Sequence, residues 1–114
     1  MTDCIFCKIV NGDIPSETIY QDDDVLVFRD LGPQAPVHVL AIPKKHISTI
    51  NDIQPADAEL IGKLYLAAQN VAKAEGMDDS GYRCVMNCND DGGQTVHHIH
   101  LHILGKRKLT WPPG

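Results

Sequence analysis

The sequence predicts an α+β domain with a mainly antiparallel sheet, and three observations lead to that expectation. Short apolar runs bounded by Gly, Pro and Asp recur along the chain and are typical of strands. Only residues 53–76 carry apolar side chains at helical spacing over many turns. The polar turn at residues 22–24 is short enough to join its neighbours as an antiparallel hairpin. The length, 114 residues, suits one domain that spans residues 1–114 and has its own core.

Five strands and a short N-terminal helix accompany the long helix. Residues 4–10 are expected to form one or two helical turns that end near Gly12. Residues 31–36 contain two prolines and a glycine and form a loop, whereas the turn at residues 91–94 is rich in glycine. The expected strands are residues 16–21, 25–30, 38–43, 81–87 and 96–104.

The long helix has start and stop signals as well as the right period. Pro55 suits the first helical position, and Asp57 and Glu59 suit the first turn, where acidic side chains stabilise the helix dipole. Gly76 can cap the end. The apolar stripe, which we interpret as core packing, comprises Leu60, Leu64, Ala67, Ala68 and Val71.

Composition excludes several classes of protein. The chain is 43% hydrophobic and 22% charged, as in soluble globular proteins, and its formal charge of −5 argues against a general nucleic-acid binder. No apolar run approaches the ~20 residues of a membrane span. The first residues lack the basic start and long apolar stretch of a signal peptide. We therefore expect a cytoplasmic protein with no membrane or nucleic-acid partner.

The four cysteines fall into two kinds. Cys84 and Cys88 have no motif spacing, and we expect both to be buried free thiols. Cys4 and Cys7 form a C-x-x-C pair. In a reducing cytosol such a pair favours a metal or redox role over a structural disulfide.

The most informative stretch is HHIHLHILG, residues 97–105. On a strand, residues two apart share a face, so His98, His100 and His102 are expected to point to one side. His97 and the interleaved apolar residues would point to the other side, and we assign His97 no role. The apolar side can pack on the long helix, which leaves the histidines facing a cleft.

Two kinds of chemistry could use these histidines. A three-histidine metal site is one, but His98 and His102 would lie roughly 13 Å apart at Cα, too far to share an ion without a sharp bend. Phosphate chemistry is the other. A neutral imidazole with one nitrogen bonded to a backbone carbonyl keeps a lone pair that can attack phosphorus and form a phosphoryl-histidine intermediate. The glycines of the turn at residues 91–94 can bring backbone N–H groups close to phosphate oxygens.

The chain also resembles a known family. H-I-H-L-H-I-L matches the histidine triad (HIT) pattern, in which histidines alternate with apolar residues. The stretches VFRDLGPQAPVHVLAIPKKHIS, GYRCVMN, DGGQTVHHIHLHILG and WPPG extend the match over essentially the whole chain and resemble the Hint branch, the nucleoside phosphoramidase-like proteins. The resemblance implies the HIT fold and a homodimer in which two five-stranded sheets join.

The resemblance implies a hydrolase that cleaves the P–N bond between a purine nucleoside monophosphate and an amine. His100 is similar to the nucleophile that becomes nucleotidylated, and His102 to its phosphate or leaving-group partner. His98 would orient the strand, and His38 is similar to a fourth histidine near the triad. The residues implied to bind the nucleotide are Asp30 at the ribose, Phe6, Ile9, Phe28 and Leu31 at the base, Asn87, Gly93, Thr95 and Val96 at the phosphate, and Trp111 reaching toward the partner's site.

The N-terminal C-x-x-C resembles that of the zinc-binding members of this branch. Their remaining ligands correspond to His46 and His98, so the implied set is Cys4, Cys7, His46 and His98. A closed Cys₂His₂ set would be tetrahedral and structural, and it would also fix the ring of His98 beside the nucleophile.

Two alternatives remain at this point. The first is a dinucleoside polyphosphate hydrolase of the related triad branch, although the WPPG ending and the GGQTV loop favour Hint. The second is a nucleotide-binding or scaffolding protein whose role does not need turnover. The sequence identifies neither the leaving amine nor the choice between adenine and guanine, because an apolar pocket discriminates weakly between them.

Overall fold

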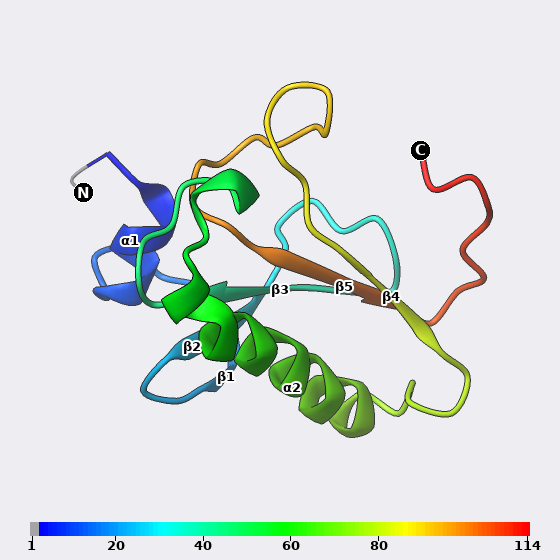
Figure 1. Cartoon of the computed structure of the whole chain (residues 1–114). Coiled ribbons are helices and arrows are strands. Elements are labelled where there is room, and N and C mark those ends of the chain that lie inside the picture. Colours follow the sequence, from blue (N-terminus) through cyan, green and yellow to red (C-terminus); the bar gives the residue numbers. More distant parts are fainter. Residues whose placement is uncertain (1–2) are drawn as a thin grey trace.

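The computed structural model describes residues 3–114 and confirms an α+β fold with a five-stranded antiparallel sheet (Figure 1). The order of strands across the sheet is β1-β2-β3-β5-β4, so β3 and β5 lie side by side although they are far apart in sequence. All seven residues of β3 are buried. The strands are β1 (Thr18–Gln21), β2 (Val25–Arg29), β3 (Val37–Pro43), β4 (Tyr82–Val85) and β5 (Leu101–Gly105).

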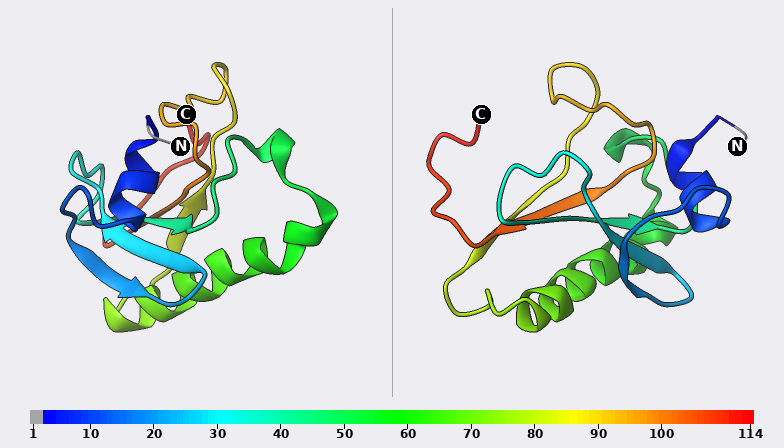
Figure 2. Two further views of the ribbon diagram at one scale, coloured as in Figure 1. Left: turned by 90° about the vertical axis from the view of Figure 1, so that its left-hand side faces the viewer. Right: turned by 180° about the vertical axis from the view of Figure 1, so that it is seen from behind.

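The two faces of the sheet are covered by different helices (Figure 2). The long helix α2 (Ala58–Ala74) packs on one face against alternate residues such as Val27 and Val39. The short helix α1 (Ile5–Val10) packs on the other face, where its Phe6 meets Phe28 and Leu40. Period-two alternation along β2 and β3 therefore builds two cores, one on each face.

The long helix ends as the sequence predicts but begins differently. The first residues of the predicted helix form the 3-10 helix η2 (Pro55–Asp57), with Pro55 in its first position, and another 3-10 helix, η1 (Ile50–Asp52), precedes them. At the other end, Gly76 has φ +70°, and the N–H of Met77 donates to the carbonyl of Ala72 at 2.9 Å. This is a Schellman cap, in which glycine adopts the left-handed conformation at least cost. In the described part of the chain, neither helix is long and apolar enough to cross a membrane.

The last strand is shorter than predicted. It begins at Leu101, and the segment that carries His98 and His100 is irregular. The reason is that the carbonyl of His98 accepts a hydrogen bond from the ring of His100 at 2.8 Å, and that carbonyl is then used locally instead of in a strand ladder. One backbone bond, from the N–H of Ile99 to the carbonyl of Ile47 at 2.8 Å, still fixes the segment to the loop that follows β3.

Strand β4 lies at the edge of the sheet, and this changes one expectation about the cysteines. Cys84 in β4 and Cys88 beyond it are free thiols, but they are half-buried instead of fully buried. An edge strand has a neighbour on one side only, so its side chains are covered less completely.

The pairing of β3 with β5 brings two histidines together. His102 lies opposite Leu40, and His38 lies opposite Leu104. His38 and His102 are therefore diagonal neighbours on the face covered by α1, within side-chain reach of each other.

Truncation of the core under α2 should destabilise the fold strongly. Leu64 is fully buried between α2 and the sheet. We expect Leu64→Ala to lower the free energy of unfolding by about 2–5 kcal/mol, because it leaves a cavity. Leu64→Met, which keeps the volume, should cost less than about 1.5 kcal/mol. Urea denaturation measures both, and equal losses would show that packing at this position is loose.

Candidate functional site

A cavity of about 270 Å³ opens on the face of the sheet that α1 covers. Helix α1 contributes Phe6 and Ile9 to its wall, and the end of β2 contributes Phe28. These apolar groups form one side, whereas two imidazoles and a carboxylate form another. The members of the predicted site that line it are Phe6, Ile9, Phe28, Asp30, Leu31, Thr95, Val96, His100 and His102.

His100 is held as a neutral imidazole with a free lone pair. Its Nδ1 lies 2.8 Å from the carbonyl oxygen of His98, and since a carbonyl can only accept, Nδ1 carries the proton. The other nitrogen, Nε2, is left without a proton. Burial lowers the pKa of His100, although the bond to His98 and the charge of Asp30 oppose that shift. Phe6 stands edge-on to the ring, with centroids 5.1 Å apart.

A chain of hydrogen bonds fixes the opposite tautomer in His102. The backbone N–H of Gln34 donates to Nδ1 of His38 at 3.0 Å, so the proton of His38 lies on Nε2. That Nε2 lies 2.9 Å from Nδ1 of His102 and donates to it. His102 therefore carries its own proton on Nε2. Burial, together with the neighbouring His100 and His38, lowers the pKa of His102 to about 4, against the opposing effect of Asp30.

Asp30 lies where β2 ends and joins this chain. One carboxylate oxygen accepts the N–H of Gly32 at 2.8 Å, and the other lies 3.4 Å from Nε2 of His38. Asp30, His38 and His102 are close enough together to suggest a metal site. The hydrogen bond from Gln34 excludes that use, because a metal would need the lone pair of His38 at the nitrogen that bears its proton.

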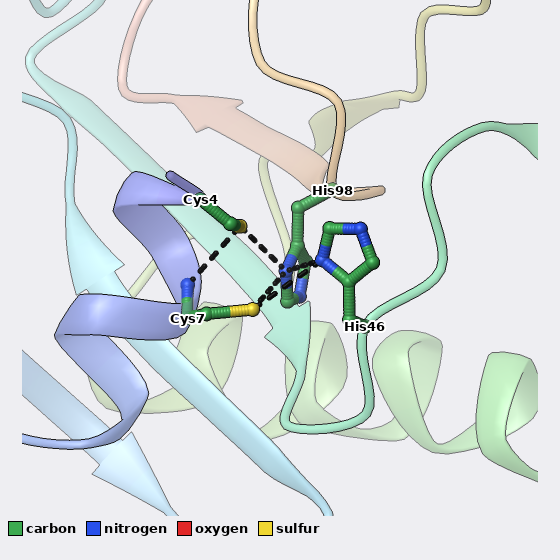
Figure 3. A group of neighbouring side chains, drawn as sticks. All are labelled: Cys4, Cys7, His46 and His98. Carbon is green, nitrogen blue, oxygen red and sulfur yellow. Dashed lines mark hydrogen bonds between the residues drawn. The ribbon is translucent and has the colours of Figure 1, made fainter. Parts of the chain in front are cut away.

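Cys4, Cys7, His46 and His98 form a second cluster beside the cavity (Figure 3). Their side chains point toward one another from three separate segments: the start of α1, the loop after β3, and the segment before β5. Nδ1 of His98 lies 3.3 Å from Sγ of Cys4 and 3.6 Å from Sγ of Cys7. Nδ1 of His46 lies 3.3 Å from Sγ of Cys7 and 3.2 Å from Nδ1 of His98.

These distances fit a tetrahedral zinc ion. Zn–S bonds of about 2.3 Å and Zn–N bonds of about 2.0–2.1 Å at tetrahedral angles separate sulfur from nitrogen by about 3.6 Å and two nitrogens by about 3.3 Å. Nε2 of His98 donates to the carbonyl of Pro43 at 2.8 Å, which leaves Nδ1 as the ligand atom. Burial raises the pKa of the Cys7 thiol and the adjacent Cys4 adds to the shift. A cation would stabilise both thiolates.

Five of the residues predicted for catalysis or nucleotide binding do not line the cavity. His38 and His98 lie behind it, where they contact His102 and the sulfur atoms. Asn87 donates to the carbonyl of Gly92 at 2.6 Å, and Gly93, with φ +77°, completes that turn. Trp111 is 81% exposed and stands apart from the cavity in this single chain.

The sequence did not identify some of the groups that shape the site. The backbone N–H of Gln34 and the carbonyl of Pro43 set two tautomers, and backbone groups leave no mark in a sequence. Gln94 is a buried amide within the glycine-rich turn, where a polar residue is normally taken to be exposed. Leu31 lines the cavity only at its rim and is fully exposed.

Comparisons with known proteins agree on one family. The family model described as "Scavenger mRNA decapping enzyme C-term binding" matches residues 3–110. A HIT family hydrolase from Legionella pneumophila is 54% identical, with a TM-score of 0.97 over 98% of this chain and 100% of that one. A HIT-like protein of Synechococcus elongatus is 47% identical over 98% of this chain and 97% of its own length.

Two further relatives of known structure are a zinc-bound protein and a nucleotide-binding protein. A zinc-bound histidine triad family protein from Mycobacterium smegmatis is 34% identical, with a TM-score of 0.83 over 96% of this chain and 81% of that one. A histidine triad nucleotide-binding protein from Candida albicans is 28% identical, with a TM-score of 0.83 over 96% of this chain and 83% of that one.

Removal of one thiol should remove the metal. We expect the wild-type chain to bind about one zinc ion, because four ligand atoms already converge. Cys7→Ser should lose zinc on dialysis, and its melting temperature should no longer fall when a chelator is added. Elemental analysis and thermal unfolding measure these effects. Cys84→Ser is the matched control, since Cys84 lies outside the cluster, and equal zinc loss in both variants would contradict the assignment.

The buried histidines should make stability depend on pH. Because the pKa of His102 falls to about 4 in the folded chain, the unfolded chain binds a proton there between about pH 6.5 and pH 4 that the folded chain does not. The free energy of unfolding should therefore fall as the pH falls through that window.

His102→Asn should reduce the slope of stability against pH by up to one proton, while its amide oxygen still accepts from His38. Urea denaturation of both proteins in the presence of a chelator measures the two slopes without a contribution from metal release. Identical slopes would show that His102 titrates normally in the folded chain.

Proposed function

The chain belongs to the histidine triad family, and on that premise we propose that it hydrolyses the P–N bond of purine nucleoside phosphoramidates. The single observation that carries the proposal is the state of His100. Its Nε2 lone pair belongs to a ring that lines the cavity, and its Nδ1 proton is held by the carbonyl of His98. A neutral imidazole in this state is a nucleophile suited to phosphorus.

The rest of the cavity suits a nucleoside monophosphate. The rings of Phe6 and Phe28, with centroids 5.5 Å apart and together with Ile9, offer an apolar slot for a base. The carboxylate of Asp30 at the end of β2 offers two acceptor oxygens for ribose hydroxyls. Thr95 and Val96 line the same cavity as His100 and could contact a phosphate group there. The nucleotide-binding relative from Candida albicans supports this class of ligand.

The reaction follows as two displacements at phosphorus. In the first, a bond forms between Nε2 of His100 and phosphorus while the P–N bond breaks, and the departing nitrogen takes up a proton from solvent. The N–H at Nε2 of His102 can donate to a phosphoryl oxygen or to that nitrogen. In the second, water attacks phosphorus and releases a proton to solvent, the bond to His100 breaks with its electron pair returning to Nε2, and the nucleoside monophosphate leaves with one oxygen from water.

A metal ion at this site would have a structural role and would not take part in the reaction. Zinc bound by the four ligands would hold the ring of His98, whose carbonyl orients His100. The zinc-bound relative from Mycobacterium smegmatis supports this ion. No open ligand position is needed for the displacements at phosphorus.

A homodimer is part of the proposal. Trp111, and Tyr65 and Leu66 on α2, are large exposed side chains, and β4 leaves one edge of the sheet open. Pairing of two chains at this edge would cover these groups and bring the Trp111 of each chain toward the other cavity.

Loss of the nucleophile should abolish turnover. We expect His100→Ala to lower kcat/KM for an adenosine phosphoramidate at least about 10³-fold, because no other group in the cavity replaces the covalent step. A rapid quench followed by mass spectrometry should find the nucleotidyl group on His100 in the wild-type chain. His97→Ala is the control, since the exposed His97 does not line this cavity, and it should change the rate less than about twofold.

The same assay separates the competing functions. Turnover by His100→Ala near the wild-type rate would refute the mechanism. Faster cleavage of a diadenosine polyphosphate than of the phosphoramidate would favour the related triad branch. Tight AMP binding without turnover of either substrate would favour a nucleotide-binding role.

A further inference from the structure

Gln94 is a buried amide that neither the proposed chemistry nor the metal ligands account for. Its side chain is 7% exposed, although it lies in a glycine-rich turn. Its Nε2 donates to the carbonyl of Ser48 at 2.8 Å and to the carbonyl of Val96 at 3.1 Å. Its Oε1 accepts the N–H of Asn89 at 2.9 Å. All three partners are backbone groups, so the amide fixes the path of three segments at once.

Two of those segments carry residues of the metal cluster and of the proposed nucleotide cavity. Ser48 lies two residues after the metal ligand His46, and their side chains are 3.2 Å apart. Val96 lies two residues before the metal ligand His98 and lines the proposed nucleotide cavity. Gln94 therefore joins the loop that carries one metal ligand to the segment that carries another.

Thr95 and Val96, together with Ile5 of α1, line two cavities. One is the proposed nucleotide cavity. The other is a cavity of about 350 Å³ that the metal ligands Cys4 and His46 line. A shift of the segment of Thr95 and Val96 would change both cavities together.

We propose that Gln94 is a positioning residue that couples the two sites, so that zinc and a nucleoside monophosphate each strengthen the binding of the other. The inference rests on the proposed function, because it assumes that zinc and a nucleotide both bind. When zinc holds His46 and His98, both carbonyl partners of Gln94 are in place and the wall of the phosphate site is ordered in advance. A nucleotide then binds without having to order it.

The coupling must be reciprocal. If zinc raises the affinity for a nucleotide by some factor, the nucleotide raises the affinity for zinc by the same factor. A buried amide N–H group that loses its hydrogen-bond acceptor destabilises the protein. Displacement of either carbonyl partner of Gln94 Nε2 is therefore unfavourable. Gln94 thus favours the state in which both loops are in position.

The test measures coupling instead of activity. Isothermal titration gives the Kd of AMP for zinc-loaded and chelator-stripped protein in three chains: wild type, Gln94→Met and Gln69→Met. Methionine keeps the length of glutamine but cannot donate, and Gln69 is the matched control because it lies on the exposed face of α2. We expect zinc to tighten AMP binding about 10-fold in the wild type and in Gln69→Met, and less than about twofold in Gln94→Met.

A second measurement needs no variant and therefore remains valid if Gln94→Met fails to fold. A chromophoric chelator withdraws zinc from the wild-type chain with AMP, with adenosine, or alone. AMP should slow the withdrawal, and adenosine, which has no phosphate, should not. An equal effect of adenosine would show that the coupling does not depend on the phosphate, and it would overturn the role of Gln94.

The remaining outcomes separate this inference from the proposed function. Unchanged coupling in a folded Gln94→Met chain overturns the inference, as does a wild-type chain that binds zinc and AMP independently. In both cases the proposed function stands. A wild-type chain that binds neither zinc nor AMP overturns the proposed function itself, and the inference with it.

Discussion

The arrangement of the site depends on the hydrogen bonds of His98, whose ring and backbone carbonyl bind different partners. Its Nε2–H is used by the carbonyl of Pro43, which leaves Nδ1 facing two thiols and His46. Its carbonyl is used by Nδ1–H of His100, which leaves Nε2 of that ring free in the cavity. One fully buried residue therefore sets the ligand atom of the metal site and the reactive atom of the neighbouring site. A change in the rotamer of His98 would disturb both.

Burial and hydrogen bonding fix different properties of the three histidines at the site: burial lowers the pKa, and a hydrogen bond assigns the tautomer. Burial is the first cause that lowers the pKa of His38, His100 and His102, and each ring also has one nitrogen committed to a fixed partner. Neutral rings with assigned tautomers are what nucleophilic attack on phosphorus requires at neutral pH. Asp30 opposes the shift in all three without forming a close pair with His100, so it can remain available to a ribose.

The sequence predicted the parts of this account that depend on period and on local caps. Alternation along β5 placed His102 at the cavity and Leu101 and Ile103 in the core under α2, whereas His98 and His100 lie before the strand. Gly76 marked the end of α2. The metal quartet required the family resemblance, because Cys4 meets His98 across 94 residues and no local pattern reports such a pairing. The tautomers could not be predicted, since the backbone groups of Gln34 and Pro43 set them. The irregular start of β5 was missed for the same reason, because His100 competes for the carbonyl of His98.

The central claim is that His100 and His102 are neutral and hold opposite tautomers. Long-range ¹H–¹⁵N correlation spectra of ¹⁵N-histidine-labelled protein at pH 7 report the protonation of each ring nitrogen directly. We expect a proton on Nδ1 of His100 and on Nε2 of His102, with the remaining nitrogen of each ring unprotonated. A proton on Nε2 of His100, or a doubly protonated His100 ring, would contradict this assignment.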